Sequence, residues 1–177
     1  KPIGTGLAGQ GLIKALGMEY MEMVVTGQRN PKVKECFETV QREGIPGDGC
    51  DMCSAALAAC FDEVMPVSSY VVVPQSGCTP FLGTFNGARN YYGVPGYTLH
   101  IPPGQNERNL GYVVDQLQEI IEDVETKIPG TKYDEDVLIE LHEKNRICAK
   151  IYRETFELLK ASPCPQAGKD AFRGVRW

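Results

Sequence analysis

Apolar residues along the chain form two kinds of pattern, short continuous runs and stripes at helical spacing. Tyr70 to Val73 is a short run rich in β-branched residues, and a second apolar run follows over residues 97–101. Continuous runs of this kind are typical of strands buried on both faces of a parallel sheet. The segment between them, residues 80–92, is expected to be a helix. Strand, helix and strand at this spacing predict a βαβ unit with a right-handed crossover.

The rest of the chain extends this pattern in both directions. Residues 3–7 and 21–25 predict strands, separated by a short helix, and residues 31–43 predict an amphipathic helix. Two long apolar stripes, over residues 110–128 and 137–159, predict two helices that close the chain. The predicted fold class is therefore α/β, with a parallel sheet of about four strands flanked by helices and followed by two long helices.

Composition and charge exclude several classes of partner. The chain has 177 residues, 42% of them hydrophobic, which is enough for one full-sized domain with a substantial core. The net charge of −5 gives no electrostatic reason to expect nucleic acid or an anionic membrane as a partner. No apolar run approaches the roughly 20 residues that a membrane span needs, and the N-terminus shows no signal-peptide pattern. Seven cysteines, an odd number, predict a reducing, cytoplasmic location.

Two cysteines lie where helices are predicted to begin. Cys50 opens an apolar helix after a Gly-rich loop, and Cys78 comes soon after the strand at residues 70–73. Directly after Cys78, Thr79 suits a helix N-cap and Pro80 suits the first helical position. Helix N-termini carry partial positive charge, which favours ionised thiols, and the thiolate is the form of cysteine that binds metals. Cys50 and Cys78 are therefore candidate metal ligands.

The remaining cysteines divide between ligand and core positions. Cys53 is ambiguous, because its place in the first turn favours a ligand whereas the helix face that it shares with Cys60 favours packing. Cys36, Cys60 and Cys148 fall on apolar faces and are expected in the core. Cys164 is expected to be exposed or to help dock a segment absent from this chain.

Other chemistries find less support. Cys50 and Cys53 have thioredoxin-like spacing, but that motif should follow the first strand, and a zinc site would favour a second close pair of cysteines. The glycine pattern at residues 4–9 lacks the acidic residue expected about 20 positions on in a dinucleotide site. His100 is expected to be structural and His142 solvated, and no nucleophile motif for a Ser/His/Asp triad is present. The two remaining interpretations are an iron–sulfur cluster held by cysteines distant in sequence and an α/β domain with buried thiols.

A series of motifs in fixed order resembles the 2-hydroxyacyl-CoA dehydratase and benzoyl-CoA reductase family. The series begins with a Gly-rich strand and LIKALG, and continues with CDMCSAALAA, YVVVPQSGC and GVPGYTLHIPP. It ends with KYDEDVLIELHEKNRICAKIY and the SPCPQAGKDAF turn, so that it covers almost the whole chain. The sequence is identified as the N-terminal portion of a subunit similar to the 2-hydroxyglutaryl-CoA dehydratase D-component.

The resemblance implies a subunit of a large anaerobic radical enzyme. It implies a Rossmann-like domain over residues 1–104 that holds a [4Fe–4S] cluster, with Cys50 and Cys78 at two ligand positions and Cys53 able to replace or join Cys50. Residues 105–177 would form a helical segment leading to a second domain, absent from this chain, that supplies the third ligand. The implied partners are a homologous second subunit, an ATP-dependent iron–sulfur activator protein, and an acyl-CoA or aryl-CoA substrate.

The implied reaction begins with the addition of one electron to a CoA thioester. In the dehydratases, which are lyases, the resulting ketyl radical expels a hydroxyl group, so that water is eliminated. In the benzoyl-CoA reductases, which are oxidoreductases, the electron goes to the aromatic ring.

Two departures from the family pattern concern the substrate. Thr79 stands where the family commonly has Asp, and the loop around Gln10 lacks the family's Pro and Glu. Because that loop lies near the substrate in the family, Gln10 and Thr79 are candidate substrate-binding residues, with Ser76 as a further polar group nearby. The alternatives left open are a benzoyl-CoA reductase subunit, a double-cubane-type reductase and a non-catalytic partner of a cluster-bearing subunit.

Overall fold

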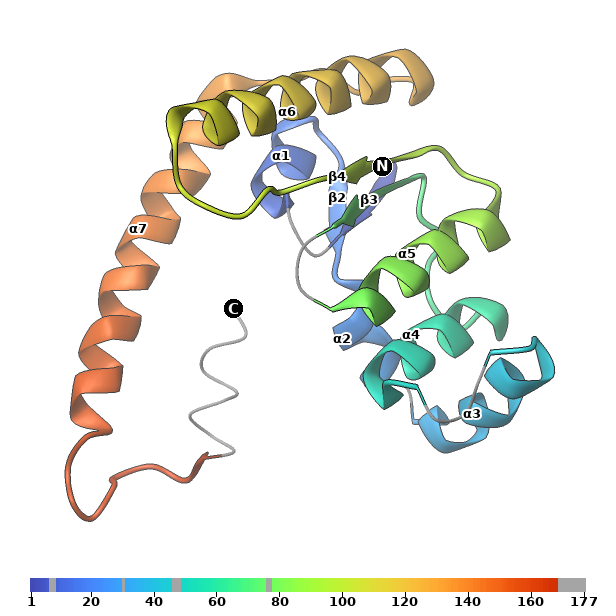
Figure 1. Ribbon diagram of the computed structural model, residues 1–177, viewed down its shortest axis with the longest axis horizontal. Helices are drawn as coiled ribbons and strands as arrows, with labels where there is room; N and C mark the ends of the chain where they lie inside the picture. Colours follow the sequence, from blue (N-terminus) through green and yellow to red (C-terminus); the bar gives the residue numbers. More distant parts are fainter. Residues whose placement is uncertain (7–8, 30, 46–48, 76–77, 169–177) are drawn as a thin grey trace. The chain divides into compact units, whose positions relative to one another are not determined.

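The computed structural model describes residues 1–6, 9–29, 31–45, 49–75 and 78–168 (Figure 1). The chain divides into two compact units, Lys1–Glu135 and Asp136–Trp177. The first unit contains a sheet with helices on both faces, and the second contains most of one long helix. The helix that follows residue 104 belongs to the first unit, and the division into functional domains at that residue stays a prediction.

The described residues form a four-stranded parallel sheet with the strand order β2-β1-β3-β4. Its strands are β1 (Ile3–Gly6), β2 (Glu19–Met21), β3 (Tyr70–Pro74) and β4 (Gly96–Leu99). Thr5 of β1 pairs with both Met21 and Val71, and Val73 of β3 pairs with Thr98. The predicted α/β fold class is confirmed, as are the predicted strands on β1, β3 and β4.

Helices cover both faces of the sheet (Figure 1). The helices of the described residues are α1 (Gln10–Ala15), α2 (Met23–Gln28), α3 (Val33–Arg42), α4 (Asp51–Phe61), α5 (Thr79–Tyr92), α6 (Glu107–Lys127) and α7 (Glu135–Leu158). Helices α1 and α6 pack on one face, and α2, α4 and α5 pack on the other. The first unit is therefore a three-layer α/β/α structure.

Strand β3 connects the two halves of the core. The side chains of Tyr70 and Val72 pack with α1 and α6, whereas those of Val71 and Val73 pack with α2, α4 and α5. All of β3 is buried, so each successive side chain enters one apolar layer or the other. This is why the strand has a continuous apolar run rather than an alternating one.

The strand predicted over residues 21–25 is wrong over most of its length. Strand β2 ends at Met21, and α2 begins two residues later at Met23. Glu22 forms the N-cap of α2, and its carboxylate accepts hydrogen bonds from the backbone N–H groups of Val24 (3.2 Å) and Val25. This cap satisfies donors at the helix start, and it outweighs the β propensity of the two valines.

Helix α4 is buried on almost every side. It packs against α2, α3 and α5 as well as lying over the sheet, and its middle is made of alanines. Small side chains allow a very close approach to α2, because a Cβ atom added at Gly27 would lie only 2.5 Å from the Cα atom of Ala56. Cys60 is fully buried here, with its thiol 3.6 Å from the sulfur atoms of both Met23 and Met65, which confirms its predicted core position.

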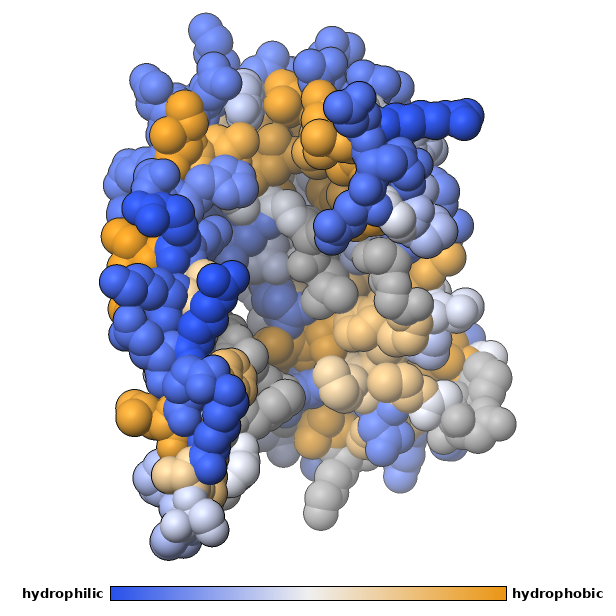
Figure 2. All heavy atoms as spheres, turned by 60° about the vertical axis from the view of Figure 1, so that its left-hand side comes forward, coloured by the Kyte–Doolittle hydropathy of each residue, from blue (hydrophilic) through white to orange (hydrophobic). Residues whose placement is uncertain are grey.

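Helix α7 carries the apolar stripe predicted from the sequence, but none of its residues, all of which the structure describes, is buried. The core position predicted for Cys148 is therefore wrong, since its side chain is exposed. The reason is that the described residues of the second unit provide no other helix or strand to cover the stripe. Apolar side chains consequently lie among charged ones on the molecular surface (Figure 2). Those exposed on α7 are Ile139, Ile147, Ile151, Phe156 and Leu158.

Candidate functional site

The carboxyl edge of the sheet collects several helix N-termini. Helices α1, α5 and α6 each follow a parallel strand, so they begin at the edge where β1, β3 and β4 end. The chain passes from β1 to β2 on one side and later to β3 on the other, which makes the boundary between β1 and β3 a topological switch point. In open α/β sheets, ligands bind beyond this edge at such a point. Gln10, the first residue of α1, and Cys78, just before α5, flank it.

Cys78 forms the N-cap of α5. Its backbone is extended (φ −92°, ψ 145°), and its carbonyl oxygen accepts a hydrogen bond of 3.2 Å from the N–H of Phe81. The helix begins at Thr79, so the predicted N-cap role of Thr79 is wrong by one residue. Because Cys78 is itself the N-cap, its exposed thiol lies at the positive end of the helix.

Cys50 has the same position on α4. It is the N-cap of that helix (φ −75°, ψ 115°), and its carbonyl oxygen accepts a 2.9 Å hydrogen bond from the N–H of Ser54. A hydrogen bond from the backbone N–H of Cys53 lowers the pKa of the half-buried Cys50 thiol. Burial opposes this effect, and the Cys53 side chain and the Met52 N–H add to it. The predicted placement of Cys50 and Cys78 at helix starts is therefore confirmed.

Cys53 lies in the first turn of α4, three residues after Cys50, and only 5% of its surface is exposed. The pKa of the Cys53 thiol is raised to about 11, mainly by burial. The charges of Cys50 and Cys78 act in the same direction, whereas the Thr84 hydroxyl acts in the opposite one. The Cys53 thiol is therefore within electrostatic reach both of Cys50 and of Cys78, which precedes the neighbouring helix α5. Cys53 combines both features that made it ambiguous in the sequence, since it lies in the first turn and is buried.

A pocket of about 350 Å³ lies between the first turns of α4 and α5. Cys50 and Cys53 line it from α4, while Thr84 and Pro80 line it from α5. Its other lining residues are Ile45, Gly49, Ser54, Leu57 and Gly83. The sequence predicted the cysteines of this site, but it gave no sign of Thr84, which belongs to no recognisable motif.

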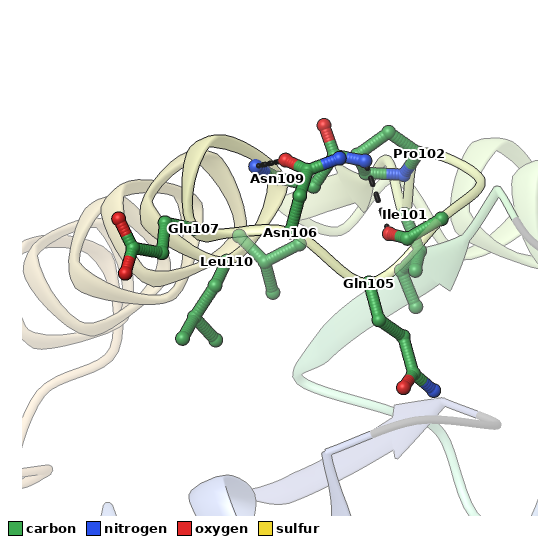
Figure 3. A pocket seen from close by; sticks show the side chains of 9 residues that line it. Ile101, Pro102, Gln105, Asn106, Glu107, Asn109 and Leu110 are labelled. Carbon is green, nitrogen blue, oxygen red and sulfur yellow. Dashed lines mark hydrogen bonds between the residues drawn. The ribbon is translucent and has the colours of Figure 1, made fainter.

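A second pocket, of about 440 Å³, follows the carboxyl end of β4 (Figure 3). Asn106 forms the N-cap of α6 and accepts a hydrogen bond of 2.8 Å from the N–H of Asn109, whose side chain donates to the carbonyl oxygens of Pro103 (2.8 Å) and Gly104 (3.0 Å). Figure 3 shows Gln105 and Leu110 extending to the same side of this braced loop. The remaining lining residues are Ile101, Pro102, Glu107 and Val113. The apolar side chains and the amide groups together suit an organic ligand with both apolar and hydrogen-bonding parts.

The other polar candidates lie at the same edge or outside the described ranges. Gln10 and Thr79 are both exposed near the switch point, and Ser76 lies outside the described residues. His100 follows β4, where the buried Gln116 side chain accepts from its N–H (2.9 Å) and donates to its carbonyl oxygen (2.8 Å). This clamp holds the backbone of His100, and the structural role of its imidazole stays a prediction. His142 is exposed, as predicted, and so is Cys164, whereas the side chain of Cys36 lies outside the described part of the structure.

Within the described ranges, no group of three or more His, Cys, Asp or Glu side chains converges on a point where it could hold one metal ion. A cubane cluster makes a different demand, because each cysteine binds its own iron atom and the thiolates need not meet at one point. Two thiols at the N-termini of neighbouring helices that flank one pocket fit that demand. The donor set is therefore suited to an iron–sulfur cluster with further ligation from outside the described residues.

Comparisons with known proteins agree with this architecture. No helix in the described part of the chain is long and apolar enough to cross a membrane. No curated protein matches the chain. The sequence profile of the family described as "2-hydroxyglutaryl-CoA dehydratase, D-component" matches residues 10–176, which is nearly the whole chain. The chain therefore belongs to the 2-hydroxyglutaryl-CoA dehydratase D-component family.

Proposed function

We propose that this chain is the cluster-holding subunit of a 2-hydroxyacyl-CoA dehydratase-like enzyme, with Cys50 and Cys78 as ligands of a [4Fe–4S] cluster. Family membership supports the coarser part of the proposal, a subunit of such a dehydratase that works with a partner subunit. The finer part is supported by one observation above all. Cys50 and Cys78, which are distant in sequence, form the N-caps of two helices that flank the same pocket.

The surroundings of the two thiols suit a negatively charged cofactor. Backbone N–H groups at the start of α4 already stabilise the Cys50 thiolate, and the positive end of α5 lies at Cys78. Apolar side chains such as Ile45 and Leu57 line the same pocket and would exclude water from a reactive intermediate. A bound cluster would supply one electron and an iron atom able to polarise the substrate oxygen. An ATP-dependent activator protein and a homologous second subunit complete the proposed system.

The second pocket is the proposed position for part of the CoA portion of the substrate. It lies beyond the carboxyl end of β4, next to the strand that leads to Cys78. Ile101 and Leu110 are apolar and exposed there, so a ligand that covered them would remove apolar surface from water. Gln105 could provide hydrogen bonds to a heterocyclic base or an amide of the CoA chain.

The test of the proposed function is a measurement of iron and acid-labile sulfide in the chain purified anaerobically with the subunits that accompany it. We expect iron in the wild type and a large loss of iron on Cys50→Ala or Cys78→Ala. Cys148→Ala is the matched control, because Cys148 is an exposed thiol on α7 and should not affect iron content. Iron that stays unchanged in both variants, or a wild type without iron, would favour a non-catalytic partner of another cluster-bearing subunit.

A further inference from the structure

We propose that Gln116 is a positioning residue for the second pocket, and that it holds this pocket in a shape that accepts the uncharged pantetheine part of CoA. This inference rests on the proposed function, which assigns part of CoA to the same pocket. It goes further by naming the part of CoA that the pocket takes. It also gives a role to a buried polar residue that does not itself line the pocket.

Gln116 lies on the face of α6 that packs against the sheet. Only 5% of its surface is exposed, and Ile120 and Val124, which follow it on this face at intervals of one turn, are apolar core residues. An apolar side chain would be sufficient for packing at such a position. Burying an amide group is unfavourable unless its donors and its acceptor are hydrogen-bonded. A glutamine here is therefore explained by its hydrogen-bond partners rather than by packing.

The side chain of Gln116 pairs with both backbone groups of His100, the residue that follows β4. Its oxygen accepts from the His100 N–H at 2.9 Å, and its nitrogen donates to the His100 carbonyl oxygen at 2.8 Å. The same nitrogen donates to the carbonyl oxygen of Tyr112 at 3.2 Å, one turn earlier in α6. Because β4 lies at the edge of the sheet formed by the described strands, this amide group supplies the pairing that a further strand would provide.

This clamp fixes the segment after β4 against α6, and the second pocket lies between them. His100 is followed directly by Ile101, which lines the pocket, and Val113 lines it from α6, one turn before Gln116. At the other end of the loop, the side chain of Asn109 braces the backbone (Figure 3). A pocket whose walls are held in this way loses little conformational freedom when a ligand binds, and its affinity is correspondingly higher.

The lining of the second pocket favours an uncharged ligand. None of the described side chains that line it is positively charged, and Glu107 brings a negative charge to the first turn of α6. The Asn106 side chain caps an N–H of the same turn, so the positive end of the helix is already offset. A phosphate group would lack a cationic partner here. The pantetheine chain instead offers amide and methyl groups that suit the Gln105 amide and the exposed apolar surface of Ile101 and Leu110.

The experiment compares Gln116→Met and Gln116→Leu with the wild type in the full chain, purified with its accompanying subunits. Both substitutions keep a side chain of similar volume that suits an apolar core, but they remove the hydrogen bonds to His100. Gln118→Met is the matched control, because Gln118 is exposed on the same helix. The readouts are the Kd for CoA and for pantetheine from calorimetry, and amide hydrogen exchange over residues 100–105. Circular dichroism measures the fraction of folded protein.

We expect the Kd for both compounds to rise about 10-fold in the two Gln116 variants and to stay unchanged in the control. Hydrogen exchange over residues 100–105 should become faster in the same variants while the protein stays folded, which a role in general stability would not produce.

Two results would overturn the inference alone. One is an unchanged Kd or unchanged exchange in a folded Gln116 variant, and the other is CoA binding with which pantetheine does not compete. A wild type that binds neither compound would instead refute the position proposed for CoA, and this inference with it, so the two failures are distinguishable.

Discussion

The close approach of α2 to α4 predicts that Gly27→Ala destabilises the protein. Gly27 faces the backbone of α4, and a Cβ atom there would lie 2.5 Å from the Cα atom of Ala56 and 2.9 Å from the carbonyl oxygen of Ala55. Ordinary contacts of a Cβ atom begin at 3.4 Å, so the helices would have to separate by about 1 Å. The atoms in the way belong to the backbone and cannot rotate aside, unlike the end of a flexible side chain.

The expected magnitude follows from two opposing terms. Overpacking a buried site costs about 1–3 kcal/mol, and this site lies near the upper end because backbone meets backbone. Alanine is favoured over glycine inside a helix by about 1 kcal/mol, which offsets part of the cost. The net loss in the free energy of unfolding is then about 2 kcal/mol, equivalent to a fall of about 4–8 °C in Tm for a chain of this size.

The assay is urea denaturation followed by circular dichroism, with Gly111→Ala as the matched control. Gly111 also lies inside a helix, α6, but a Cβ atom there would meet nothing within 4 Å. The control should therefore gain about 0.5–1 kcal/mol from helix propensity alone. A Gly27→Ala variant that is as stable as the wild type would show that α2 and α4 can separate at no cost, and the packing attributed to α4 would be wrong.

Three further outcomes are expected. In the cluster-free chain, iodoacetamide should modify Cys50 before Cys53 at neutral pH. Modification of Cys53 should increase only as the pH approaches its pKa of about 11. Equal rates of modification, measured by peptide mass spectrometry, would contradict this. Tyr70→Phe removes a 2.7 Å hydrogen bond to Asp123 and should lower the free energy of unfolding at pH 7 by about 1–2 kcal/mol. Burial raises the pKa of Asp123, but hydrogen bonds from neighbouring side chains outweigh this and hold the pKa below its usual value, so the difference between wild type and variant should shrink as the pH falls through that pKa. Leu110→Asp should raise the Kd for CoA about 10-fold by calorimetry, through the loss of about 1–2 kcal/mol of apolar contact, and an unchanged Kd would remove CoA from the second pocket.

The parts of the fold that the sequence predicted are those with strong local signals. The β-branched run of β3 is buried on both faces, and this is the situation that such a run indicates. Cys50 and Cys78 were placed at helix starts because glycine-rich or proline-containing segments surround them. The α2 segment was missed because its valines favour a strand, while the decisive group is a single capping carboxylate, that of Glu22. Cys148 was misplaced because an apolar stripe shows that a helix has a face to cover, but not whether that face is covered within this unit.

The position of Cys53 and Thr84 in one pocket depends on distances between helices, which no local pattern contains. These residues are far apart in sequence, and they meet because α4 and α5 pack closely with their first turns at the same pocket. The second pocket is similar, since its shape depends on how Asn109 braces the loop before α6. Residue type alone could identify thiols as candidates, but only the packed structure distinguishes an accessible thiol from a buried one.

The spacing of the two proposed ligands therefore depends on small residues along α5 rather than on the cysteines themselves. On the face of α5 towards α4, Thr84 lines the same pocket as Cys53, and Gly87 lies so close to Leu57 that an added Cβ atom would be 3.1 Å from the Leu57 Cδ1 atom. An alanine at position 87 would require the Leu57 side chain to shift by a few tenths of an ångström, whereas bulkier side chains there would push the helices apart. Cys50 and Cys78 would then move with them, because each residue is the N-cap of one of the two helices. Under the proposed function, the small residues of this interface therefore help to set the distance between the two ligands. A site built from helix caps is only as well defined as the packing between its helices, and in this chain small side chains provide that definition.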